Sequence, residues 1–146
     1  MKSLHTYRNR WKQLRNEEKM LFFKASVSLL LIKSGLLLLP FPTFRKVYNR
    51  LAKSDKKKDV SGQQIDAAVW AVKSAADHLP VELLCLPRAL ATKYLLRKVP
   101  ALTLEIGVEI TPAKVFEAHA WVEKNGSVII GDWPETVSYQ RLWVWE

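Results

Sequence analysis

The chain of 146 residues contains one cysteine, three histidines and five glycines. A single cysteine cannot form a disulfide within the chain, so this is not a disulfide-stabilised secreted domain. The histidines have no cysteine or histidine partners at metal-ligand spacing, which argues against a zinc site. No cleavable signal peptide is visible, and we therefore expect a protein of the reducing cytoplasm. The 49% hydrophobic content excludes disorder and is sufficient for one packed core.

The charged residues divide the chain near residue 58. Residues 1–58 carry fifteen Lys or Arg against three Asp or Glu, a net charge of +12, whereas residues 59–146 carry eight against eleven, a net charge of −3. We therefore predict a basic apolar helical segment over 1–58 and a catalytic part over 59–146, joined by a polar loop at 54–62. Such a basic segment can contact nucleic acid, an anionic membrane surface, or an acidic protein or peptide.

A long apolar stretch dominates the basic segment. The pattern predicts a helix over 16–39 and, after Pro40, a basic helix over 43–53. Lys24 and Lys33 interrupt the apolar stretch and leave eight residues between them, whereas a bilayer span needs about 20 apolar residues. We therefore favour a buried helix, or one in weak contact with a membrane surface, over a transmembrane helix. No nucleic-acid-binding motif accompanies the basic residues, so nucleic acid is not an expected partner.

The second part alternates between helical and strand patterns. Apolar residues at helical spacing predict helices over 63–78 and 85–98, the second with a proline in its first turn. Strict alternation over 102–110 predicts a half-buried strand, and a hairpin and a last strand over 139–145 follow. The predicted fold class is therefore α+β, with helices packed on an antiparallel sheet.

The most informative element is the predicted hairpin that turns at Asn125–Gly126. A two-residue turn there pairs Val122 with Ile129 and puts His119 directly opposite Asp132, on a non-hydrogen-bonded pair with Cα atoms about 4.5 Å apart. A carboxylate at that place can accept the imidazole N–H and leave the other ring nitrogen to deprotonate a nucleophile. A bulge or a slip of one residue would break this register.

Cys85 is the candidate nucleophile for such a histidine. It stands at the start of a predicted helix, where the dipole and unpaired backbone N–H groups favour a thiolate and can bind an oxyanion. We therefore predict a catalytic triad of Cys85, His119 and Asp132; a packing role is the alternative for the cysteine or the histidine taken alone. Trp121 and Glu117 share the strand face of His119 and are candidates for the substrate cleft, although packing is an equal alternative for the tryptophan.

Several short elements occur together over residues 60–133, including Cys85-Leu86, the strand at 106–108, 119–123 with the sequence His-Ala-Trp-Val-Glu, and Gly131-Asp132. Together they resemble the transglutaminase-like leader peptidases of lasso-peptide biosynthesis, which belong to the papain-like cysteine proteases. The chain length suits the split form, in which the protease is separate from its recognition partner. Two features depart from that family. Val99-Pro100 replaces its common glycine, and no clear glutamine precedes the cysteine to serve an oxyanion hole.

The resemblance implies a cysteine peptidase that removes the leader of a ribosomally synthesised lasso precursor and frees the core for macrolactam cyclisation. It implies Cys85 as nucleophile, His119 as base and acid, and Asp132 as the residue that orients the histidine, without a metal or an organic cofactor and with ATP dependence left open. The implied partners are a leader-binding recognition protein, the precursor peptide and a macrolactam cyclase, and the helices of 1–58 are the candidate docking surface. Two alternatives remain: a transglutaminase-like acyl transferase and a non-catalytic peptide-binding scaffold.

Overall fold

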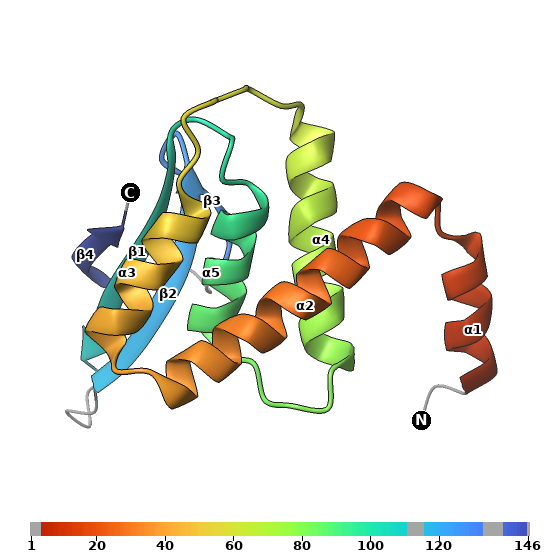
Figure 1. Cartoon of the computed structure of the whole chain (residues 1–146), viewed down its shortest axis with the longest axis horizontal. Helices are drawn as coiled ribbons and strands as arrows, with labels where there is room; N and C mark the ends of the chain where they lie inside the picture. The colour runs from red at the N-terminus through yellow and green to blue at the C-terminus, as the bar shows by residue number, and fades with distance from the viewer. Residues whose placement is uncertain (1–3, 111–115, 133–138, 146) are drawn as a thin grey trace.

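The computed structural model describes residues 4–110, 116–132 and 139–145, and within these ranges helices are followed by an antiparallel sheet (Figure 1). This order is the α+β architecture predicted from the sequence. The helices are α1 (Leu4–Gln13), α2 (Asn16–Leu38), α3 (Phe41–Ala52), α4 (Gly62–His78) and α5 (Cys85–Leu95). The strands are β1 (Leu102–Ile110), β2 (Phe116–Lys124), β3 (Ser127–Ile130) and β4 (Gln140–Trp145).

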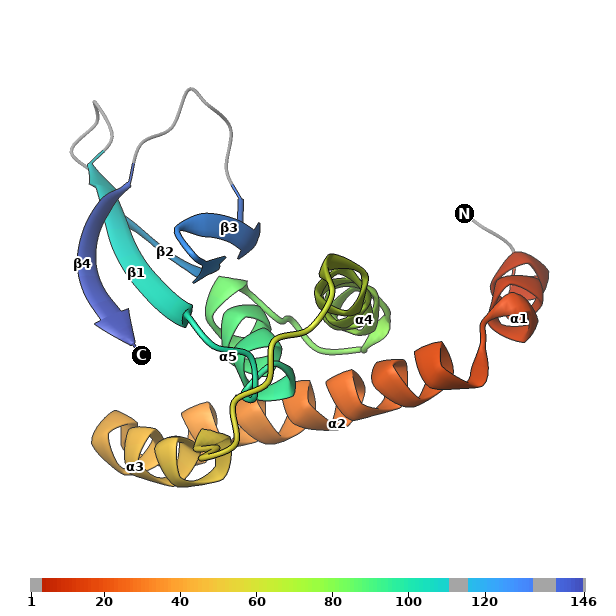
Figure 2. The ribbon, with the colours of Figure 1, turned by 90° about the horizontal axis from the view of Figure 1, so that it is seen from above.

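The described strands form one sheet in the order β3-β2-β1-β4, and all neighbours are antiparallel. Alternation fixes the core face of this sheet, since Leu102 and Leu104 of β1 and Ala120 and Val122 of β2 are buried in the hydrophobic core. Figure 2 shows α5 between the sheet and α2, which runs across α4 and α5. The helix that begins with Cys85 therefore packs directly on the sheet.

The N-terminal segment and the rest of the chain share one hydrophobic core. Ala25 and Leu29 of α2 are fully buried, in the same cluster as Val72 of α4 and Leu90 of α5. Tyr48 of α3 adds a polar contact, because its hydroxyl donates a hydrogen bond to the Leu90 carbonyl at 2.7 Å. The two parts that differ in charge are thus packed on each other.

α2 is covered by the protein on one side only. By length and composition it is long and apolar enough to cross a membrane. Within its most apolar stretch of 18 residues, 17% is buried inside the protein. Its inner side contributes to the core with α4 and α5. Its outer side forms an apolar stripe that consists of Met20, Phe23, Val27, Leu30, Leu31, Leu37 and Leu38.

Two helix ends differ from the prediction by more than one residue. α3 begins at Phe41 with Pro40 as its N-cap residue, ahead of the predicted start at Thr43. Its first turn therefore includes Pro42, and proline is tolerated at this place in a helix. α5 ends at Leu95, three residues early, and a turn follows it. The predicted polar loop is present before α4, which is capped by the Ser61 hydroxyl.

The hairpin has the predicted turn but a different register. The pairs next to the turn are those predicted, and a bulge then places Val122 opposite Ile130 instead of Ile129. An extra residue on one strand displaces every later partner by one position. The prediction that His119 lies directly opposite Asp132 is therefore wrong.

Candidate functional site

Cys85 is the first residue of α5, and its side chain is partly exposed. The preceding residue, Leu84, is extended and provides no side-chain cap, so the first backbone N–H groups of α5 lack a capping side chain. Ala89 and Leu90, one turn further along, are buried and anchor the helix in the core. The thiol therefore lies at a fixed helix N-terminus, where the helix dipole favours a negative charge.

His119 lies on β2, where it alternates with the core residues of that strand. Its Nε2 atom lies 2.5 Å from the carbonyl oxygen of Gly131. A carbonyl oxygen can only accept a hydrogen bond, so Nε2 carries the proton, and the lone pair of a neutral ring lies on Nδ1. This main-chain contact fixes the tautomer of the neutral imidazole and the orientation of its ring.

Cys85, His119 and Asp132 line one cavity of about 370 Å³. The fold thus brings together the three residues selected from the sequence, from α5, from β2 and from the segment after β3. No group of three or more His, Cys, Asp or Glu in the described ranges is arranged to hold a metal ion. The remaining lining residues are Lys73, Leu83, Leu84, Arg88, Ala89, Ala120, Ile130 and Gly131.

The bulge changes how the aspartate relates to the histidine. Asp132 is exposed, and within the described part of the chain no hydrogen bond joins its carboxylate to His119. The imidazole contacts the main-chain carbonyl of the preceding residue, Gly131, which has a φ of +86°. Asp132 therefore follows the residue that contacts the imidazole, and it lines the same cavity.

The two residues predicted for the substrate cleft lie outside the lining of this cavity. Trp121 is only 2% exposed, so its ring packs within the protein and offers almost no surface to a substrate. Glu117 is exposed on β2. For Trp121, the packing alternative is the one that its burial supports.

Tyr139 is a site residue that the sequence did not indicate. Its ring stacks on that of His119, with centroids 5.0 Å apart and an interplanar angle of 25°. Burial and, after it, the charges of nearby carboxylates and of Cys85 raise the pKa of the Tyr139 hydroxyl above its usual value. The tyrosine was expected only to begin the last strand, and no spacing in the sequence relates it to the histidine.

A comparison with family models gives one match that covers most of the chain. Residues 29–144, which are more than half of the chain and include all three candidate residues, match the model described as the transglutaminase-like superfamily. The chain belongs to the transglutaminase-like superfamily. Its superfamily includes cysteine peptidases and acyltransferases. Comparison with curated proteins and with solved structures gives no significant match.

The superfamily assignment bears on both halves of the chain. The matched region begins inside α2 and ends inside β4. It therefore includes the helices α3, α4 and α5 and the strands β1, β2 and β3. A transglutaminase-like protein with a cysteine at a helix start and a strand histidine has the groups needed for acyl transfer through a thioester. The acceptor of the acyl group, water or an amine, decides between a peptidase and a transferase.

Proposed function

We propose that this protein is a cysteine peptidase that removes the leader from a ribosomally synthesised lasso precursor peptide. The observation that carries the proposal is the shared cavity, which is lined by Cys85 at the start of α5, by His119 and by Asp132. The resemblance of the sequence elements around these residues supplies the substrate class. The proposed product is a core peptide with a free N-terminus, which a macrolactam cyclase then closes.

The proposed reaction has two steps. The thiolate of Cys85 attacks the scissile carbonyl carbon, and the backbone N–H groups at the start of α5 stabilise the oxyanion. His119 gives a proton to the leaving amine, which frees the core peptide. Water, deprotonated by the same imidazole, then hydrolyses the thioester and releases the leader as a carboxylic acid. This chemistry requires no metal or organic cofactor, and the reducing cytoplasm keeps the thiol available.

Asp132 has a supporting role in this proposal. The Gly131 carbonyl already accepts the Nε2 proton of the histidine, and a carboxylate at the next residue stabilises the imidazolium by its charge. We therefore expect Asp132→Asn to lower kcat and to leave leader binding unchanged. The loss should be smaller than for Cys85→Ala, which removes the nucleophile.

A leader-binding recognition protein is proposed to dock on the apolar stripe of α2. Exposed apolar patches of this kind mark interaction surfaces in soluble proteins. The surrounding segment carries a net charge of +12 over residues 1–58, so a partner with an apolar contact face rimmed by acidic side chains fits it. Leu31, which is 67% exposed, lies in the middle of the stripe.

The decisive experiment incubates a candidate precursor with the wild-type protein and with Cys85→Ala, each with and without the recognition protein, and measures the products by mass. The peptidase is supported if the wild type, and not Cys85→Ala, forms a leader fragment and a core fragment. The masses of these two fragments should sum to that of the precursor plus one water. An adduct with an added amine and no gain of water identifies an acyl transferase instead. Equal cleavage by Cys85→Ala refutes the proposed nucleophile.

The docking surface has its own matched pair of variants. Leu31→Ser should weaken capture of the recognition protein, because it removes apolar contact area from the stripe. Leu142→Ser is the control, since Leu142 is 63% exposed but lies on β4, away from α2. Isothermal titration calorimetry of each variant with the recognition protein measures the affinity. Equal affinities of the two variants would show that the partner docks elsewhere.

A further inference from the structure

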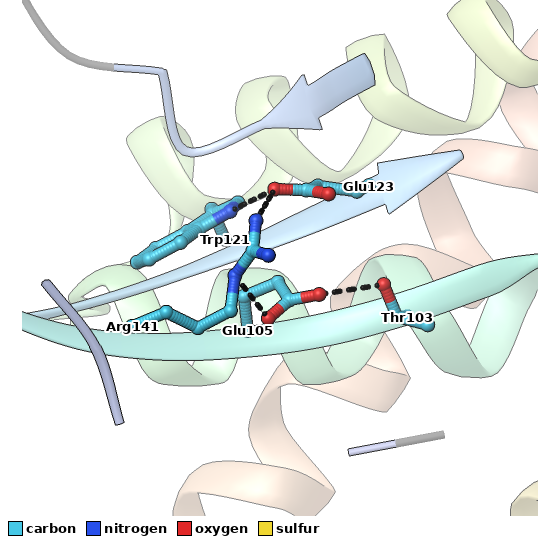
Figure 3. Close-up of polar contacts among 5 residues, drawn as sticks. All are labelled: Thr103, Glu105, Trp121, Glu123 and Arg141. Carbon is cyan, nitrogen blue, oxygen red and sulfur yellow. Dashed lines mark hydrogen bonds and ion pairs between the residues drawn. The ribbon is translucent and has the colours of Figure 1, made fainter. Parts of the chain in front are cut away.

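A chain of polar contacts leads from the last strand to the tryptophan beside the candidate base (Figure 3). The indole Nε1 of Trp121 donates a hydrogen bond to Glu123 Oε1 at 2.8 Å. The same carboxylate oxygen accepts a hydrogen bond from the guanidinium of Arg141 at 2.9 Å. Arg141 also forms an ion pair with Glu105 at 2.8 Å, and Glu105 accepts a hydrogen bond from Thr103. These contacts connect β1, β2 and β4.

Both glutamates of this polar chain are buried, which is unusual for charged side chains. Glu105 is 3% exposed and Glu123 is 8% exposed. A buried carboxylate is costly unless it is paired and hydrogen bonded, and a buried ion pair is only weak evidence of a gain in stability. Arg141, whose side chain is 53% exposed, supplies the charge that both carboxylates need. The arrangement therefore fixes side-chain orientation more than it adds stability.

The orientation that it fixes is that of Trp121. Glycine at position 107 leaves room for the indole, since a Cβ atom there would lie 2.8 Å from the ring. Trp121 in turn stacks on His119, with centroids 6.1 Å apart and an interplanar angle of 20°. Tyr139 also contacts both rings, at 5.0 Å and 6.2 Å between centroids. The imidazole thus contacts two aromatic rings, which also contact each other.

We infer that Arg141, Glu123 and Trp121 are positioning residues, which hold the imidazole of His119 at the Gly131 carbonyl and so fix its orientation in the cavity that it shares with Cys85. The inference rests on the proposed role of His119 as the base. None of the three residues lines the cavity, so they act through the histidine and not on the substrate. A misplaced base lowers the rate of the proton transfer it performs, and a displacement of about 1 Å can cost about a hundredfold.

The test measures alkylation of Cys85 by iodoacetamide as a function of pH in the full-length protein. A histidine that serves the thiol gives a reactive thiolate near pH 6 to 7, and this readout needs no peptide substrate. We expect Trp121→Phe, which keeps a ring and loses the N–H, to lower the alkylation rate about tenfold in that range and to leave the rate at high pH unchanged. Trp143→Phe is the matched control on β4, where its ring packs on Trp145.

A second pair of variants separates positioning from folding. Glu123→Gln keeps an oxygen that can accept the indole N–H, whereas Glu123→Leu removes it and leaves the ion pair of Arg141 with Glu105 in place. We expect the glutamine variant to retain most of the alkylation rate at pH 6 to 7 and the leucine variant to lose it, with both folded by circular dichroism. This difference supports the inference, because a purely structural carboxylate would not be rescued by the amide.

Three results overturn the inference. The first is a wild-type profile that follows an ordinary thiol at every pH, because no imidazole would then serve Cys85. The second is a Trp121→Phe profile equal to that of Trp143→Phe, and the third is equal loss for the two Glu123 variants. Failure of the peptidase proposal is seen separately, as wild-type protein that shows the reactive thiolate and does not cleave the precursor.

Discussion

Replacement of Gly131 by alanine tests the geometry of the candidate site most directly. Gly131 has a φ of +86°, and a Cβ atom there would lie 2.7 Å from the Ala120 carbonyl oxygen and 2.9 Å from the Trp121 Cβ. Both neighbours are main-chain or near-main-chain atoms, so the clash cannot be relieved by rotation of a flexible side chain. The variant therefore has to move the segment whose carbonyl accepts the hydrogen bond from His119.

The chain contains a control for the backbone part of this cost. Gly126 in the hairpin turn has a φ of +82°, and a Cβ atom there would meet nothing within 4 Å. A left-handed alanine costs about 1–2 kcal/mol at either position. Overpacking adds about 1–3 kcal/mol at Gly131 alone. We therefore expect the free energy of unfolding to fall by about 1–2 kcal/mol in Gly126→Ala and by about 2–5 kcal/mol in Gly131→Ala.

Urea unfolding followed by tryptophan fluorescence measures both values in the same buffer. Iodoacetamide alkylation of Cys85 near pH 7 then reports whether the imidazole has moved. We expect the rate to fall in Gly131→Ala and to remain at the wild-type value in Gly126→Ala. Equal destabilisation by the two alanines, together with equal alkylation rates, would refute the close contact of Gly131 with Ala120 and its role at the imidazole.

Three further predictions concern the scaffold. Leu90 is fully buried behind the start of α5, so Leu90→Ala should lower the free energy of unfolding by about 2–5 kcal/mol in urea titrations, and a loss below 1 kcal/mol would contradict its place in the core. Burial raises the pKa of Tyr48 above its usual value of 10.0, so the folded state holds this proton more tightly and the free energy of unfolding should decrease as the pH rises above 10. Tyr48→Phe should be about 1 kcal/mol less stable at pH 7 and should lose less stability at alkaline pH. If the free energy of unfolding depends on pH in the same way in both proteins, the hydroxyl is not buried. The Ser61 hydroxyl caps α4, so Ser61→Ala should cost about 1 kcal/mol, whereas Ser54→Ala in the same exposed loop should cost little in thermal unfolding.

Helices and strands were predictable because their signals are local. The strand over 102–110 was predicted from strict alternation and is β1 with the same limits. The helix starting at Cys85 was predicted from proline in its first turn and from the apolar spacing after it. Neighbouring residues determine such patterns, and tertiary contacts adjust only their ends, as at Leu95 and Phe41.

The site was only partly predictable. Cys85, His119 and Asp132 were selected from the sequence and line one cavity, whereas the contact of the imidazole with Gly131 was not foreseen. A single extra residue in the ladder causes this difference, and no signal in the sequence marks it. Tyr139 was missed for a related reason, because the pairing of β4 with β1 across the sheet brings it to His119.

The sequence by itself determined the fold class, the elements that carry the candidate residues, and the basic apolar character of the N-terminal segment, because periodicity, turn residues and charge act over a few positions. Tertiary structure alone decided which atom holds the imidazole, which rings surround it, and which carboxylates are buried with Arg141. These contacts join residues far apart in the chain, and their geometry depends on bulges and strand order. Local pattern does not specify either of these.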